Sequence, residues 1–141
     1  MPRGVRIAFK RESAKPAVVH GIDERLGQVF RNLIDNAVSF SPENGVVRVS
    51  VGNVGSVVRA TIDDQGPGIP TADIDRIFDR FFTSRPAEQG FGKNSGLGLA
   101  IARQIVASHS GRIWADNLRN AEGKKCGARF TVELPLARQN A

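Results

Sequence analysis

Two asparagines, Asn32 and Asn36, stand four residues apart in a segment whose apolar residues follow a helical spacing. In a helix they would share one polar face, one turn from each other. Asparagine is a poor helix former, so the pair costs helix stability. Its amide oxygen suits Mg²⁺, which takes few protein ligands and completes its shell with water and phosphate oxygens. For the pair alone a merely solvated face is the simpler interpretation; the glycine motifs further along the chain favour the metal.

An acidic, glycine-rich segment follows a predicted strand at 63–70, with the sequence Asp-Asp-Gln-Gly-Pro-Gly-Ile-Pro. Gly66 and Gly68 open the backbone there, so a planar ligand such as a nucleotide base could approach it closely. Taken by themselves, the same residues are equally well interpreted as a Pro-Gly turn rich in acids.

A second glycine-rich run, 90–99, leads into a predicted helix. The exposed N–H groups and the positive dipole end of a helix N-terminus bind phosphate. The run is not a Walker A loop, because Ala87 stands where the first glycine is needed and Asn94 where Ser or Thr is needed. No Gly-x-Gly-x-x-Gly is completed in the chain either. The sequence therefore predicts a phosphate site of another kind.

The spacing of apolar residues predicts the elements that would position these motifs. They are an opening hairpin over 5–9 and 16–19, a helix from 22 to about 40, a second hairpin over 47–51 and 57–62, a short helical stretch at about 71–80, a polar loop over 83–95, a last helix from 97 to 110, and closing strands over 112–116 and 128–134. This order lacks the regular strand–helix alternation of a doubly wound parallel sheet. We therefore predict an α+β fold, a two-layer α/β sandwich whose mixed, mainly antiparallel sheet carries the helices on one face.

Length and composition predict one soluble globular domain over residues 1–141. A single cysteine, Cys126, excludes an internal disulfide and a zinc–cysteine cluster. No apolar run reaches the eighteen or so residues of a membrane-spanning helix. The net charge of +6 would suit nucleic acid, but the cations are spread along the chain and there is no Tyr for base stacking. We therefore expect no nucleic-acid partner.

Four motifs occur together in one order, and as a set they resemble a known family. They are Asn32-Leu-Ile-Asp-Asn36-Ala, Asp64-Gln-Gly66-Pro-Gly68-Ile, Ile77-Phe78-Asp79-Arg80-Phe81-Phe82 and Ser95-Gly96-Leu-Gly98-Leu-Ala-Ile. The set is similar to the N, G1, F and G2 boxes of the catalytic ATP-binding domain of bacterial sensor histidine kinases. The resemblance covers essentially the whole chain and implies the Bergerat ATP-binding fold shared with gyrase B, Hsp90 and MutL, among which the F box favours the histidine kinases. The run 83–96 also resembles the ChvG-type kinases of alphaproteobacteria.

The resemblance implies a site for ATP and Mg²⁺. It makes Asn36 the Mg²⁺ ligand, Asn32 a contact to phosphate or to the shell of the metal, and Asp64 the acceptor for the amino group of adenine. Arg80 becomes a candidate contact for the γ-phosphate, and together with the two asparagines it forms the implied catalytic set. The remaining nucleotide contacts implied are Phe40, Gly66, Gly68, Ile69, Lys93, Ser95, Gly96, Leu97 and Gly98.

Two positions depart from the family pattern. Ser39 and Thr83 stand where the family often has cationic residues. The cation that contacts the γ-phosphate therefore stays open among Arg80, Arg85 and Lys93. Residues 83–95 are expected to form a lid that closes over the triphosphate.

The function that the resemblance implies is transfer of the γ-phosphoryl group of ATP to a histidine on a separate dimerisation domain. Neither His20 nor His109 lies in the acceptor-histidine pattern, so we expect a fragment of a dimeric bacterial inner-membrane receptor, of which this is a cytoplasmic domain. The expected partners are the helical acceptor domain and an OmpR-like response regulator. Two alternatives stay open: an ATP-sensing module without transfer, which Ser39 and Thr83 allow, and an anti-sigma-factor type serine kinase, which the F box and the basic charge disfavour.

Overall fold

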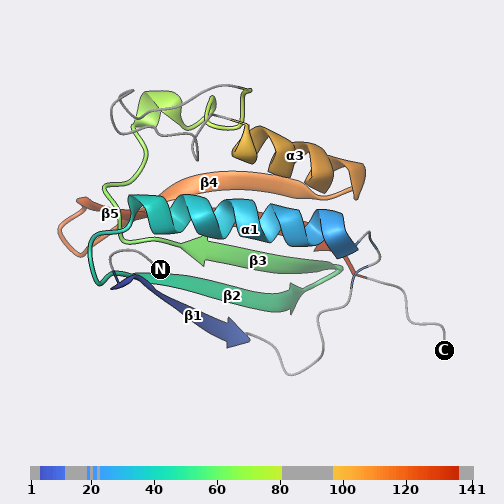
Figure 1. Ribbon diagram of the computed structural model, residues 1–141, viewed down its shortest axis with the longest axis horizontal. Helices are drawn as coiled ribbons and strands as arrows, with labels where there is room; N and C mark the ends of the chain where they lie inside the picture. The colour runs from blue at the N-terminus through green and yellow to red at the C-terminus, as the bar shows by residue number, and fades with distance from the viewer. Residues whose placement is uncertain (1–3, 12–18, 20, 22, 81–96, 137–141) are drawn as a thin grey trace.

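The computed structural model describes residues 4–11, 19, 21, 23–80 and 97–136 of the chain (Figure 1). Over these residues the elements are β1 (Arg6–Arg11), α1 (Asp23–Phe40), β2 (Val46–Val54), β3 (Val57–Asp63), the 3₁₀ helix η2 (Thr71–Asp73), α3 (Gly98–Ser108), β4 (Arg112–Arg119) and β5 (Lys125–Pro135). The predicted first helix, second hairpin and last helix are confirmed. None of the described helices combines the length and the apolar character that a membrane crossing requires.

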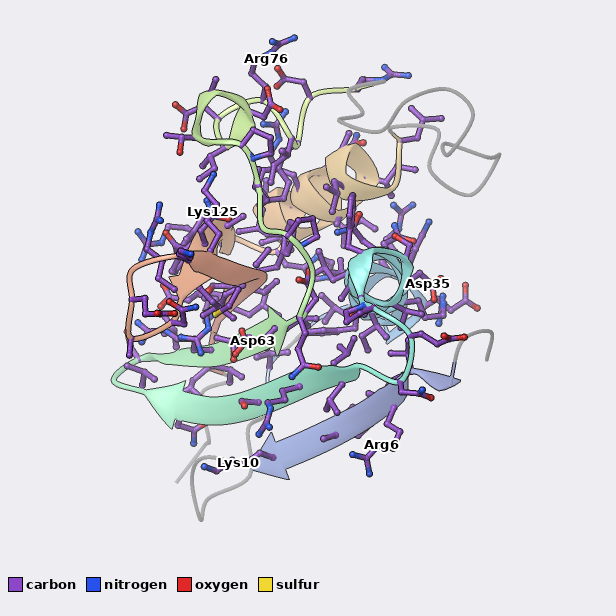
Figure 2. The ribbon with its side chains drawn as sticks, turned by 90° about the vertical axis from the view of Figure 1, so that its left-hand side faces the viewer. Arg6, Lys10, Asp35, Asp63, Arg76 and Lys125 are labelled. Atoms are coloured by element: carbon purple, nitrogen blue, oxygen red, sulfur yellow. The ribbon has the colours of Figure 1, made fainter. Side chains whose placement is uncertain are left out.

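The strands form one five-stranded sheet in the order β1-β2-β3-β5-β4. The pair β1 and β2 is parallel, and every other neighbouring pair is antiparallel. Both α1 and α3 lie on the same face of this sheet, and no described helix covers the opposite face (Figures 1 and 2). The predicted two-layer sandwich with a mixed, mainly antiparallel sheet is confirmed.

The core lies between the sheet and the two helices. The helix α1 contributes a fully buried stripe at four-residue spacing, formed by Val29, Leu33 and Ala37. Alternate strand residues and one side of α3 complete the core, and their buried side chains include Val47, Val49, Ile62, Ala102, Ile105, Val106, Phe130 and Val132. Burial of the stripe fixes the rotation of α1 about its axis. Asn32 and Asn36 therefore lie at the border of the core, where both are half-buried.

The opposite face of the sheet carries acids that are paired with arginines. Glu133 is only 4% exposed, and its carboxylate accepts hydrogen bonds from Arg59 and Arg112 on the two neighbouring strands, each at 2.7 Å. These bonds, that of Arg112 first, hold the pKa of Glu133 below its usual range. Asp63 accepts two hydrogen bonds from Arg129, at 2.7 and 2.8 Å. Apolar residues on one face and paired charges on the other fix the register of the strands.

The predicted opening hairpin is only partly covered by the described residues. Its first arm is the strand β1, which pairs in parallel with β2, a strand far from it in the sequence. Of the predicted second arm, 16–19, only Val19 is among the described residues, and it belongs to no strand. Alternating apolar residues predict that a segment is a strand, but the pattern does not say which strand it pairs with.

The predicted helical stretch at about 71–80 is helical only in its first residues, and there it is a 3₁₀ helix. It consists of η2 and successive turns, in which Asp73 N–H donates to Pro70 O at 2.8 Å and Arg76 N–H to Asp73 O at 2.8 Å. Bonds of this i to i−3 type form a 3₁₀ arrangement. The closing strands β4 and β5 are longer than predicted. The predicted loop over 83–95 lies outside the described residues.

Candidate functional site

A buried carboxylate lies just after the end of β3. Asp64 is 3% exposed, and its Oδ1 accepts hydrogen bonds from the backbone N–H groups of Gly66 at 2.8 Å and Ala128 at 3.0 Å. Burial raises the pKa of Asp64, and the two hydrogen bonds partly oppose that rise. Both bonds that described residues donate to the carboxylate go to Oδ1. Oδ2 is therefore the oxygen that can accept a hydrogen bond from a ligand.

The loop after Asp64 is packed against the end of α1. A Cβ atom on Gly66 would lie 2.6 Å from the carbonyl oxygen of Phe40, the last residue of α1. Gly68 has a φ of +84°, which residues with a side chain rarely adopt. Both glycines are thus required by the path of the loop itself. The sequence left two interpretations open, a backbone opened to a ligand and a Pro-Gly turn.

The first turn of α3 lies beside the middle of α1. Asn32 Nδ2 donates a hydrogen bond to the carbonyl oxygen of Gly98 at 3.1 Å. The residue before the helix, Leu97, provides no side-chain cap, and the first turn contains no acidic residue. The N–H groups of this turn therefore keep their capacity for an anion.

Asn36 lies on α1 one turn after Asn32 and one turn before Phe40. It is half-buried, at the border between the core and the surface. The described residues contain no group of three His, Cys, Asp or Glu side chains that could hold a metal ion. A cation at Asn36 would depend on amide oxygens and on the oxygens of a ligand. This donor set fits Mg²⁺, which often binds through one or two protein groups and substrate phosphates.

Apolar side chains attach the segment 71–80 to the core, and two of them are buried. Ile77 and Phe78 are each 6% exposed, and Phe78 packs edge-to-face on Phe130 with the ring centroids 6.0 Å apart. Arg80, at the end of this described segment, is exposed. The apolar residues of the F box therefore anchor the segment, and Arg80 lies on the surface.

Contacts to α1 bring three of the four motifs together. Asn32 bonds Gly98, and the carbonyl oxygen of Phe40 is adjacent to Gly66. The N, G1 and G2 motifs therefore meet along one helix. The predicted residues that lie outside the described part of the chain are Lys93, Ser95 and Gly96, together with Thr83, Arg85 and the lid over 83–95.

Sequence reasoning missed Asn117 in β4. Its side-chain amide bonds both main-chain polar groups of Ile69, a partner 48 residues away in the sequence. Lys125 donates a third hydrogen bond to the same residue, at 3.0 Å. Asn117 is a single polar residue in a strand, and no local pattern marks it. Only the pairing of β4 with β5 places it beside the loop.

This arrangement belongs to a known class of ATP-binding domain. The family described as histidine kinase-, DNA gyrase B- and HSP90-like ATPase matches residues 21–138. The chain belongs to this family.

Relatives and solved structures narrow the class. Sensor protein ChvG of Agrobacterium fabrum is 48% identical over 133 residues, which make up 93% of this chain and 22% of that protein. The mycobacterial sensor histidine kinase MprB has a structure that matches with a TM-score of 0.80 and 32% identity, over 96% of this chain and 85% of that chain. A structure of histidine kinase ThkA in complex with response regulator TrrA matches with a TM-score of 0.73 and 29% identity, over 96% of this chain and 35% of that chain.

Within the family, the chain is a catalytic ATP-binding domain of the sensor histidine kinase class. The resemblance to ChvG-type kinases that the sequence suggested is confirmed. The chain spans about a fifth of the length of the Agrobacterium relative.

We expect the substitution Asp64→Asn to stabilise the nucleotide-free chain at neutral pH. Asn keeps an oxygen that can accept from Gly66 and Ala128, and it removes the charge whose burial raises the pKa of Asp64. An acid with a raised folded-state pKa favours folding when protonated, so the unsubstituted chain loses stability relative to the variant as the pH rises through that pKa. Urea unfolding at pH 7 should show a gain of about 1 kcal/mol, which should shrink towards pH 4.

Asp63→Asn is the matched control, one residue away. The carboxylate of Asp63 is bonded twice by Arg129, so loss of its charge should lower the free energy of unfolding at pH 7. If Asp64→Asn lowers that free energy as much as Asp63→Asn does, the buried charge of Asp64 is not a cost to the fold.

Proposed function

We propose that this chain binds Mg·ATP and transfers the γ-phosphoryl group to a histidine on a separate helical domain. The observation that carries the proposal is the buried carboxylate of Asp64, whose Oδ2 can accept one more hydrogen bond. This carboxylate lies at the start of the segment 64–69, which we call the glycine loop. The amino group of adenine is a suitable donor, whereas guanine has a carbonyl oxygen at the same position. A carboxylate in this setting therefore selects adenine.

The phosphates are proposed to lie between α1 and the start of α3. There Asn32 supplies a polar contact, and the uncapped N–H groups of the first turn after Leu97 attract anionic oxygens. Asn36 is the proposed protein ligand of Mg²⁺, which when bound neutralises charge on the phosphates. The residues of the chain then act by positioning the nucleotide, and no covalent protein nucleophile is required. The cation at the γ-phosphate stays a prediction among Arg80, Arg85 and Lys93.

The proposed reaction needs segments that this chain does not contain. We propose that the acceptor histidine lies on the dimerisation helices of a longer parent, because the chain covers only part of its curated relative. A response regulator is the proposed downstream partner, supported by the complex of ThkA with TrrA, and the OmpR-like type is proposed from the family resemblance. On the same resemblance, we propose a cytoplasmic position within an inner-membrane receptor.

Phosphotransfer between two separate proteins tests the proposal. The chain is mixed with Mg²⁺, ATP labelled in the γ-phosphate, and a separately produced acceptor-helix domain from its parent or from Agrobacterium ChvG. We expect acid-labile, base-stable label on a histidine of the acceptor domain. ATP binding without transfer would favour the sensing module, and acid-stable label on serine would favour the serine kinase. A chain that binds no ATP would overturn the proposal altogether.

Asp64→Asn should weaken ATP binding and shift the preference from ATP towards GTP. Because two backbone N–H groups hold Oδ1, the Asn oxygen should stay there and its Nδ2 should face the base. That donor opposes the amino group of adenine and suits the carbonyl oxygen of guanine. We expect the Kd for ATP to rise at least about tenfold. Calorimetric titration of both proteins with ATP and GTP measures this, and an unchanged ATP to GTP affinity ratio would remove Asp64 from base recognition.

Asn36→Ala should abolish the part of ATP affinity that depends on Mg²⁺. The substitution removes the one proposed amide ligand. Mg²⁺ exchanges a bound water for a protein oxygen only where that oxygen is well placed, so a lost ligand is not readily replaced. The matched control is Asp35→Ala, since Asp35 is the exposed neighbour on α1 and points away from the core (Figure 2). Kd is measured in Mg²⁺ and in EDTA: the control should respond to Mg²⁺ as the unsubstituted chain does. If Asn36→Ala responds equally well, the metal assignment is wrong.

A further inference from the structure

The main chain of Ile69 is held by two side chains of the β4–β5 hairpin. Ile69 N–H donates to Asn117 Oδ1 at 2.6 Å, and the carbonyl oxygen of Ile69 accepts from Asn117 Nδ2 at 2.8 Å. Lys125, labelled in Figure 2, donates from Nζ to the same carbonyl oxygen at 3.0 Å. Ile69 is only 9% exposed, so its N–H group would be left buried and unsatisfied without Asn117.

The two ends of the glycine loop are fixed by one pair of facing residues in the sheet. Asn117 in β4 lies opposite Ala128 in β5. Ala128 bonds Asp64 twice, because its N–H donates to Oδ1 at 3.0 Å and its carbonyl oxygen accepts from Asp64 N–H at 2.9 Å. Asn117 bonds Ile69 twice. The segment from Asp64 to Ile69 is therefore anchored at its start and at its end by this single pair.

Gly68 lets the loop lie directly on these anchoring side chains. A Cβ atom there would lie 2.7 Å from Asn117 Oδ1 and 3.2 Å from both Cβ and Cδ of Lys125. On the other side of the loop, Gly66 touches the end of α1. The loop is thus confined between the β4–β5 hairpin and α1, and a change at Asn117 would alter its position relative to the helix.

We infer that Asn117, supported by Lys125, is a positioning residue for base recognition. It holds the loop in the conformation that keeps the Asp64 carboxylate and the glycine backbone ready for the base, so binding does not have to order them. The inference rests on the proposed function, because it assigns the base to this loop. Asn117 acts at the base end of the proposed site, so its loss should weaken ATP and ADP binding alike and should leave phosphoryl transfer at saturating ATP unchanged.

The experiment compares Asn117→Ala with Asn120→Ala. Asn120 lies in the same hairpin, and its Oδ1 also accepts from two backbone N–H groups, but these belong to Glu122 and Lys124 in the hairpin turn and not to the loop. Binding of ATP and ADP is titrated at a temperature where circular dichroism shows every variant folded. We expect Asn117→Ala to raise both Kd values about tenfold, with KM for ATP raised and kcat unchanged in the phosphotransfer assay. Asn120→Ala should lower Tm without changing either Kd.

Lys125→Met is a second, milder variant, used in case Asn117→Ala does not fold. It keeps a stem against Gly68 and removes one of three hydrogen bonds to Ile69, so both Kd values should rise about threefold. The inference is overturned if either variant is folded and binds ATP and ADP as tightly as the unsubstituted chain, or if Asn120→Ala weakens binding as much as Asn117→Ala. Failure of the unsubstituted chain to bind ATP would instead refute the proposed function.

Discussion

A carboxylate buried without a cationic partner among the described residues determines how the chain is built around the base end of the proposed site. Two acids in the described part of the chain are almost fully buried, and their environments differ. Glu133 receives hydrogen bonds from two arginines, and its pKa falls. Asp64 receives hydrogen bonds from two backbone N–H groups of described residues, and burial raises its pKa. Glu133 thus contributes to the sheet, whereas the buried charge of Asp64 is a cost to the fold, which the proposed contact to adenine would explain.

The hydrogen bonds that offset the burial of the Asp64 charge constrain the backbone on both sides of this residue. The loop must turn back so that the Gly66 N–H reaches the carboxylate, and this brings it against the end of α1, where only glycine fits. β5 must approach so closely that a Cβ atom on Gly127 would collide with the carbonyl oxygen of Asp64. The glycines around this acid are therefore explained by close packing of the chain on itself, and any surface open to the proposed base is a consequence of that packing.

The sequence could predict the parts of the site that depend on local pattern. The stripe of Val29, Leu33 and Ala37 sets both the helix and the side on which its asparagines lie, so α1 followed from spacing alone. Parts that depend on distant partners could not be predicted in this way. The apolar spacing of 71–80 is compatible with an α-helix and with 3₁₀ turns, because either can bring Phe78 onto Phe130. The structure has 3₁₀ turns. Asn117 has no local signal, because its role arises from a strand pairing that brings it to Ile69.

The helix α1 and the β4–β5 hairpin position different parts of the proposed site. From Asn32, which meets α3, to Phe40, which meets the glycine loop, α1 extends about 12 Å along its axis. The base end is fixed from the sheet by Ala128 and Asn117, whereas at the start of α3 the carbonyl oxygen of Gly98 accepts a hydrogen bond from Asn32 of α1. The proposed contacts to the base and to the phosphates therefore rest on different elements, so a rearrangement at the phosphate end of the proposed site would leave the bonds that hold the base end intact.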